Sequence, residues 1–310
     1  MKSSIGTIMA AVDRDDRPRE VAAKAVELAR LSGAEVELFH CDAERAYSRQ
    51  HEYDPRAAVR ARESCLDESR RFLDSLWSSL DVRDVRASMR VACESPLYEG
   101  IVHAVERDHP DIVIRGSRKA RDASRDGAGS AAGLNANDWE LVRSCPSPLL
   151  LTHGRAWKPH PVIAAAIDLS AAEPAELTGA ILRTAAAVAR SAGGNLEIVH
   201  AGPFDCAQPH EEQSRRTALA ERAKSAGVEA AVIHVIPGEP AAVLPEFALA
   251  RDFDLIVLGA LTHRKALTAL VGTLTGKLIE TLDCDCLLVK SSAAARAAGD
   301  PGNPAPRGAK

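Results

Sequence analysis

The chain has 310 residues, of which 46% are hydrophobic and 26% are charged, a balance typical of a globular protein long enough for two domains. Its net charge of −4 gives no general electrostatic reason to bind nucleic acid or an anionic membrane. No run approaches the ~20 apolar residues of a membrane span, and the apolar stretch near the N-terminus is too short for a signal peptide. We therefore expect a cytoplasmic protein without nucleic-acid or membrane partners.

The first half of the chain predicts alternating strands and helices. A buried strand runs from Ile5 to Asp13, and an Ala-rich helical stretch from Arg19 ends at Gly33, which suits a C-cap. Further strands are predicted over residues 35–41, before Glu94, over 111–116 and over 145–151. Because the strands are continuously apolar rather than alternating, they indicate a parallel sheet covered by helices on both faces.

The second half repeats the same order of elements. Its strands are predicted over residues 162–168, 195–201, before Gly238, and over 254–259 and 284–289, and its first helix over 176–192. The sequence thus predicts an α/β fold with two tandem five-stranded parallel-sheet domains of Rossmann-like type. We expect domains at 1–153 and 161–290, a linker at 154–160, and a disordered tail at 291–310 that is rich in Ala, Gly and Pro.

A glycine-framed loop ends the fourth strand of the second half. The strand stops at Gly259, Thr262 follows, and Gly272 and Thr273 open the next predicted helix, 274–282. Glycine lets backbone N–H groups approach a ligand without a Cβ in the way, and the start of a helix carries partial positive charge. The spacing therefore predicts a phosphate site in the second domain.

These features resemble a tandem universal stress protein. The resemblance rests on Asp168 closing the first strand, on His200 ending the second, and on the glycine loop, and residues 137–148 and 238–289 are most similar to the E group. It implies two domains of the adenine nucleotide alpha hydrolase-like type, paired about a pseudo-twofold axis, with ATP bound in the second. The nucleotide-binding residues that it implies are Asp168, Ala201, Gly259, Thr262, Gly272 and Thr273.

The resemblance also carries one departure and one expectation about assembly. The family has glycine where this chain has Thr262, and a β-branched side chain there disfavours positive φ and tight triphosphate binding. Asp168 is expected either to contact the ligand or to cap the next helix. The last strands, near Leu149–Leu151 and Leu287–Val289, are expected to pair, and a further homodimer stays open.

The first half does not keep the glycine loop. Between Gly116 and Gly133 the segment is longer than its counterpart and carries a basic cluster. We expect this cluster to be a solvated loop, with contact to an anionic ligand as the alternative; its members are Arg115, Arg118, Lys119, Arg121 and Arg125. The first domain is therefore expected not to bind ATP in the family manner, and to hold another ligand or a protein partner, or to be structural.

Neither catalysis nor a metal site is predicted. The seven cysteines indicate reduced, mostly buried thiols, and Cys284 and Cys286 lack the partner pair that a metal site needs. His40, His200 and His234 lie on or beside strands and are expected to be structural. No nucleophile stands in a G-x-S-x-G context, and no Walker A lysine follows the glycines.

Three functions follow from these observations. The first is a cytoplasmic stress-response protein that binds ATP in its second domain and acts as a regulatory or protective switch through conformation or partners. The second is a nucleotide-free interaction or scaffold protein in which both sites are degenerate, as Thr262 suggests. The third is a slow ATPase, which the residues permit but do not demand.

Overall fold

The computed structural model describes residues 5–14, 16–42, 55–117, 134–170, 173–205, 208–229, 232–260, 262–263, 270–271 and 273–291. Three expectations concern residues outside these ranges: the disorder of the tail, the site role of Gly272, and the basic cluster beyond residue 117. None of the described helices is long and apolar enough to cross a membrane.

Each half alternates strands and helices, as the apolar runs predicted. The first half contains β1 (Thr7–Ala11), α1 (Pro18–Ser32), β2 (Glu35–Cys41), α3 (Pro55–Ser78), β3 (Ala87–Ala92), α4 (Leu97–Asp108), β4 (Ile112–Gly116), α6 (Ala136–Ser144) and β5 (Leu149–Thr152). The second half contains β6 (Val162–Ala166), α7 (Ala175–Ser191), β7 (Asn195–Gly202), α8 (Pro209–Ser225), β8 (Val232–Pro237), α9 (Pro240–Ala250), β9 (Leu255–Gly259), β10 (Thr262–His263), β11 (Leu270–Val271), α10 (Thr273–Thr281) and β12 (Asp285–Val289).

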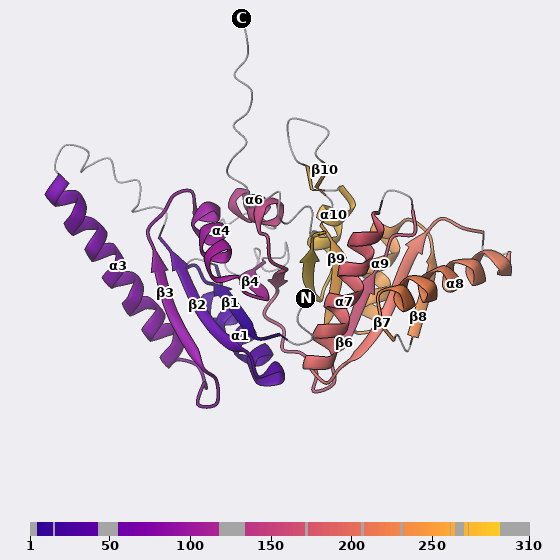
Figure 1. The fold of residues 1–310 in the computed structure, drawn as a ribbon, viewed down its shortest axis with the longest axis horizontal. Coiled ribbons are helices and arrows are strands. Elements are labelled where there is room, and N and C mark those ends of the chain that lie inside the picture. The colour runs from indigo at the N-terminus through magenta and orange to yellow at the C-terminus, as the bar shows by residue number, and fades with distance from the viewer. Residues whose placement is uncertain are drawn as a thin grey trace, which may run out of the picture.

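The main strands of both halves join in one ten-stranded sheet in the order β3-β2-β1-β4-β5-β12-β9-β6-β7-β8. The order reads the same from both edges, so the halves are related by a pseudo-twofold axis between β5 and β12. Figure 1 shows the two halves side by side. These two strands pair antiparallel, with Leu150 opposite Leu287, while the other neighbouring strands of the described sheet run parallel. The α/β class, the tandem halves and the pairing of the last strands are confirmed.

Helices cover both faces of the sheet. Side chains that alternate along β1 point to opposite sides, because successive residues of a strand face opposite ways. Ile8 and Ala10 belong to the core beneath α1, α3, α7 and α8, whereas Met9 and Ala11 belong to the core beneath α4, α6, α9 and α10. Both cores run through the two halves, so the molecule has one continuous sheet with a layer of helices on each side.

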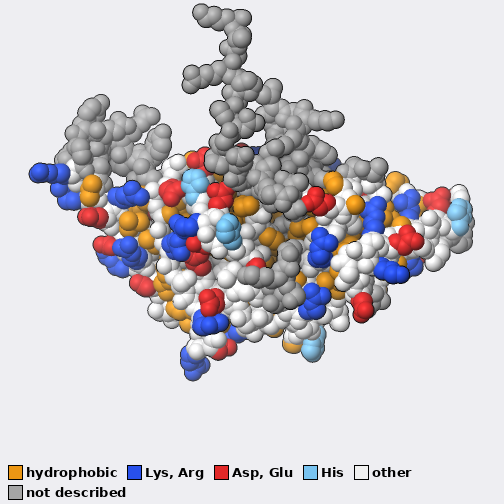
Figure 2. Space-filling model, viewed as in Figure 1, with side chains coloured by type: hydrophobic (Ala, Val, Ile, Leu, Met, Phe, Trp, Pro, Cys, Tyr) orange, Lys and Arg blue, Asp and Glu red, His pale blue; other side chains and the backbone are white. Residues whose placement is uncertain are grey.

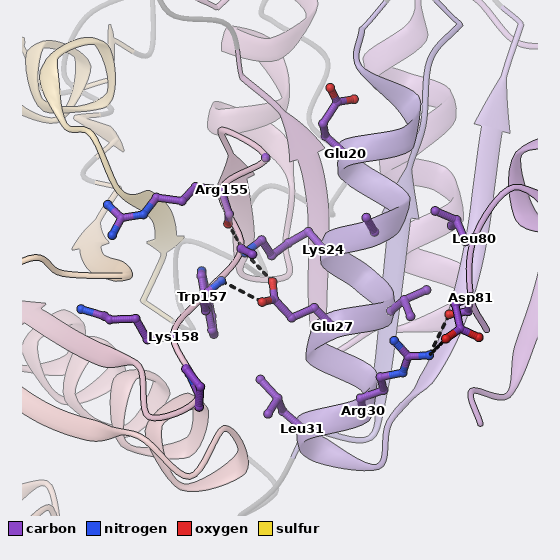
Figure 3. A pocket seen from close by; sticks show the side chains of 15 residues that line it. Glu20, Lys24, Glu27, Arg30, Leu31, Leu80, Asp81, Arg155, Trp157 and Lys158 are labelled. Carbon is purple, nitrogen blue, oxygen red and sulfur yellow. Dashed lines mark hydrogen bonds and ion pairs between the residues drawn. The ribbon is translucent and has the colours of Figure 1, made fainter. Parts of the chain in front are cut away.

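The linker predicted at 154–160 is built into the joint between the halves. Trp157 is 8% exposed, and its Nε1 donates to Asp285 Oδ2 at 2.8 Å. Lys24 of α1 lies 3.2 Å from the same carboxylate, 2.6 Å from Glu27, and donates to the carbonyl of Arg155. Figure 3 shows Lys24 and Glu27 projecting from α1 toward this linker. The segment therefore fixes the two halves against each other.

A hollow of about 480 Å³ lies between α1 and the linker (Figure 3). Its cationic side chains already have carboxylate partners: Arg30 contacts Asp84, and Arg155 and Lys158 both contact Asp252. These charged groups of the hollow are therefore satisfied within the chain. We treat the hollow as part of the joint.

Basic and acidic side chains are interspersed over the visible face of the molecule (Figure 2). No single-sign patch stands out on that face, which agrees with the small net charge.

Replacing Lys24 with methionine is expected to lower the free energy of unfolding by about 3–5 kcal/mol, because Asp285 would keep a buried charge without its cation. Urea denaturation measures the loss. The control is Lys224→Met on the exposed side of α8, which is expected to change stability by less than about 1 kcal/mol. Equal losses in the two variants would contradict this account of the joint.

Candidate functional site

A pocket of about 280 Å³ opens at the carboxyl ends of β6, β7 and β9. Open α/β sheets bind ligands at this edge, because the loops that leave the strands there diverge and leave a crevice. The walls are mostly apolar and carry a few polar groups. Its lining residues are Ala166, Ile167, Asp168, Glu173, Val199, Ala201, Pro240, Leu244, Leu258, Gly259, Leu274, Thr275 and Leu278. Its volume lies just below the ~300–1,000 Å³ that is usual for ligand pockets.

Three of the six predicted site residues, Asp168, Ala201 and Gly259, line this pocket. Thr273 begins α10, and the next two residues of that helix, Leu274 and Thr275, also line the pocket. The start of α10, where backbone N–H groups lack helical partners, therefore lies beside the pocket. Gly272 lies outside the described residues.

The backbone of Thr262 stands in a short hairpin after β9. It opens β10, which pairs antiparallel with β11, so that Thr262 lies opposite Val271. Extended backbone suits a β-branched residue, which explains how the chain accommodates threonine where the family has glycine. The hairpin strand β11 lies against α6 of the first half. The loop after β9 thus contacts the other half of the molecule.

Asp168 stabilises the turn that follows β6 through two hydrogen bonds to Ser170. Its Oδ1 accepts from the backbone N–H of Ser170 at 2.8 Å, and its Oδ2 accepts from the Ser170 hydroxyl at 2.6 Å. It does not cap α7, whose N-cap is Pro174, so the predicted alternative of helix capping is wrong. Each carboxylate oxygen has a second lone pair, so the group still has capacity for a ligand donor.

Gly259 has a packing role that the sequence argument did not anticipate. A Cβ added there would lie 2.9 Å from Leu177 Cδ2 and 3.2 Å from Ile181 Cδ1, both on α7. The absence of a side chain therefore lets α7 approach the end of β9. The carbonyl of Gly259 accepts from the Thr275 hydroxyl at 3.2 Å, and this hydrogen bond connects the start of α10 to β9.

Glu173 is a pocket residue that the sequence analysis missed. It is 8% exposed, and its Oε1 accepts from the Thr178 hydroxyl at 2.6 Å. Burial raises the pKa of its carboxyl to about 7, with Asp168 adding a like charge and Arg222 opposing the rise. The sequence signal was a carboxylate immediately before Pro174, five residues after the strand-end aspartate, but only the fold shows that it is buried.

The predicted structural role of the strand-end histidines agrees with their contacts. Nδ1 of His40 lies 2.9 Å from the carbonyl of Val12, and Nδ1 of His200 lies 2.9 Å from the carbonyl of Ile167. Burial lowers the pKa of both rings, so both are neutral at pH 7. Among the described residues, no group of three or more His, Cys, Asp or Glu side chains could hold a metal ion.

In the first half, the matching strand position carries a buried arginine, Arg115. Arg115 precedes the last glycine of β4 as Leu258 precedes the last glycine of β9, but its side chain is 2% exposed. Its Nε lies 3.0 Å from Asp138 Oδ1, and its Nη2 lies 3.5 Å from Asp13 and 3.4 Å from Asp16. The prediction of a solvated Arg115 is wrong, because the strand carries this residue inside the fold, where carboxylates surround it.

Backbone N–H groups at the start of α6 in the first half already have side-chain hydrogen-bond partners. Asn135 accepts from the backbone N–H of Asp138, and Asp138 accepts from that of Asn135, which completes a capping box. Within the part of the chain that the structure describes, three carboxylates surround the Arg115 guanidinium. Among the described residues of the first half, the position equivalent to the pocket thus holds a buried ion-pair network around Arg115.

Replacing Arg115 with leucine, the residue at the matching position of β9, is expected to cost about 3–5 kcal/mol of unfolding free energy, because Asp138 would stay buried without a cation. Urea denaturation checks this. Arg70→Leu serves as the control, since Arg70 pairs with Asp67 on the surface and such pairs contribute about 0–1 kcal/mol. A cost for Arg115→Leu as small as that of the control would mean that the network is not structural.

Glu173 is expected to make stability depend on pH. Its pKa is about 7 in the folded chain against 4.5 ordinarily, so the folded state binds the proton more tightly between these values. Stability should fall by about 3 kcal/mol as pH rises from 4.5 through 7, and stay level above. In Glu173→Gln this part of the fall should vanish, whereas Glu176→Gln, on the exposed first turn of α7, should keep it. Thermal unfolding from pH 4.5 to 8 measures both, and identical profiles would contradict the assignment.

Known proteins match the chain over both halves. Residues 4–153 and 163–290 each match the model of the universal stress protein family. Universal stress protein E of Escherichia coli is 21% identical over 295 residues, which cover 90% of this chain and 91% of that protein. The universal stress protein E homolog of Haemophilus influenzae is 27% identical over 227 residues, covering 67% of this chain and 71% of that protein.

Solved structures share the fold. A universal stress protein from Archaeoglobus fulgidus matches with a TM-score of 0.68 at 14% identity, over 92% of this chain and 98% of that chain. A second, from Pseudomonas aeruginosa, gives 0.67 at 21% identity, over 96% and 97%. Shorter universal stress proteins solved in complex with cAMP and with dAMP also match, over 43% and 42% of this chain, each with a TM-score of 0.32. The predicted resemblance is confirmed: with two family segments that span most of its length, the chain belongs to the universal stress protein family.

Proposed function

We propose that the second half binds an adenine nucleotide, ATP, in the pocket at the ends of β6, β7 and β9, and that this protein is a cytoplasmic stress-response switch that acts through conformation or partners. The observation that supports the proposal most is the convergence of Asp168, Ala201 and Gly259 on one cavity of about 280 Å³. These residues come from three separate strands, and only the parallel sheet brings them together.

The chemistry of the lining suits the parts of a nucleotide. Val199, Leu244 and Leu258 offer apolar walls for a flat base, and Ala201 leaves space at the strand end. Asp168 supplies an acceptor for ribose hydroxyls. The start of α10 favours an anionic phosphate group, because the first backbone N–H groups of a helix have no partner within the helix.

A nucleotide-free interaction protein is the second candidate, and one observation favours it. Thr262 lies in the β10–β11 hairpin, whose second strand lies against α6, so this part of the loop is engaged in contacts within the chain. In that case the pocket would be a remnant, and the output would come from the surface.

Filling the pocket tests the proposal. In Ala201→Leu the larger side chain would occupy space at the pocket, so we expect the affinity for ATP to fall by about tenfold or more, ~1.4 kcal/mol. Isothermal titration calorimetry with ATP and ADP measures it, and phosphate release in the same samples reports any slow hydrolysis. The control is Ala220→Leu, on the exposed side of α8 in the same half, which should bind as the unmodified chain does.

Saturable binding of one nucleotide per chain that is weakened only by Ala201→Leu would support the proposed site. An unmodified chain that binds neither nucleotide would overturn it and favour the interaction protein. Binding that survives Ala201→Leu unchanged would place the nucleotide elsewhere.

A further inference from the structure

Two cysteine sulfurs meet at the outer edge of the first half. Cys65 lies on α3, and Cys93 follows directly after β3. The Sγ of Cys65 donates to the Sγ of Cys93 at 3.4 Å. A disulfide has an S–S length of ~2.05 Å, so the two sulfurs would need to approach by only about 1.4 Å. The pair belongs neither to the pocket of the second half nor to the Arg115 network.

The two thiols differ in access. Cys65 is 1% exposed, whereas Cys93 is half-buried and reaches the surface. A small oxidant in solution would therefore meet Cys93 first, with the thiol of Cys65 already in contact behind it. This arrangement of one accessible and one adjacent buried thiol is what an oxidation followed by internal cross-linking needs.

We propose that Cys93 and Cys65 form an oxidation site at which a peroxide produces an intramolecular disulfide between α3 and the turn before α4. In the first step the Cys93 thiolate attacks one oxygen of hydrogen peroxide, an S–O bond forms and the O–O bond breaks, and the leaving hydroxide takes up the proton that the Cys93 thiol had released and departs as water, which gives a sulfenic acid. In the second step the Cys65 sulfur attacks the Cys93 sulfur, the S–S bond forms, the S–O bond breaks, and the hydroxyl leaves as water with the Cys65 proton. The two thiols lose two electrons in total, and the hydrogen peroxide is reduced to two water molecules.

The surroundings of Cys65 favour a disulfide that forms slowly and persists once it has formed. Burial, followed by the contact with Cys93 and the charge of Asp42, raises the pKa of the Cys65 thiol to about 12. Little thiolate is present at neutral pH, so the second step is slow. Because the Cys65 thiol stays protonated, no thiolate stabilises the reduced pair. The disulfide should therefore resist reduction once it forms.

A third thiol, that of Cys41 at the end of β2, lies close by and provides an internal comparison. Its Sγ donates to the carbonyl of Glu94 at 3.4 Å, so it points at the backbone next to Cys93. Burial raises the pKa of this thiol to about 12 as well. The proposal assigns the cross-link to Cys65, whose sulfur already touches that of Cys93.

The test treats the folded full-length chain with hydrogen peroxide, blocks the remaining thiols, and maps tryptic peptides without reduction. Cleavage after the flanking arginines puts Cys65 in peptide 63–70 and Cys93 in peptide 91–107. We expect these two peptides to appear linked, and the link to disappear with dithiothreitol. The cross-link closes a loop between positions 28 apart, so the oxidised chain should unfold about 5–10 °C higher than the reduced one.

Three variants make the result specific. Cys93→Ser, at a half-buried position, and Cys65→Ala should each abolish both the linked peptide and the rise in unfolding temperature. Cys145→Ala, which removes a buried thiol at the end of α6, should keep both. A link from Cys93 to Cys41, a cross-link between two chains, or a Cys93 that proceeds to sulfinic acid with Cys65 still reduced would each overturn the proposal.

Discussion

The antiparallel pairing of β5 with β12 is the constraint on which the molecule depends. Each half ends its sheet with a strand of aliphatic residues, and Leu150 and Leu287 are almost completely buried where they face each other. Left alone, either strand would expose an apolar edge with unpaired backbone groups. Pairing removes both edges at once and turns two five-stranded sheets into one. The linker then completes the joint, because Trp157 and Lys24 both contact Asp285 at the start of β12.

Duplication of the module let the two halves diverge at the same strand position. In the second half Leu258 lines a pocket, and the start of α10 lies beside that pocket. In the first half Arg115 stands at the matching position, and carboxylates of Asp13, Asp16 and Asp138 surround it. A buried guanidinium requires such partners. At this strand position the second half thus has an apolar side chain that lines a pocket, whereas the first half has a buried arginine with carboxylate partners.

The site and the thiol pair lie in different halves and depend on different features of the fold. The pocket forms where the loops after parallel strands diverge, and its residues come from strand ends of the second half. The contact between Cys65 and Cys93 forms where α3 crosses the outer strand of the first half. A ligand and an oxidant would therefore act on separate elements, which the shared sheet connects.

The sequence by itself determined the class of fold and its repetition, because continuous apolar runs, Ala-rich helical stretches and strand-end glycines are local features. It also marked the ends of strands where Asp168, Ala201 and Gly259 lie. The tertiary structure alone decided what surrounds each of them. It showed that Arg115 is buried, that Glu173 lies inside the pocket with a raised pKa, and that Gly259 serves the packing of α7. Burial, pKa and contact between distant segments depend on neighbours brought together by folding, and no local pattern contains them.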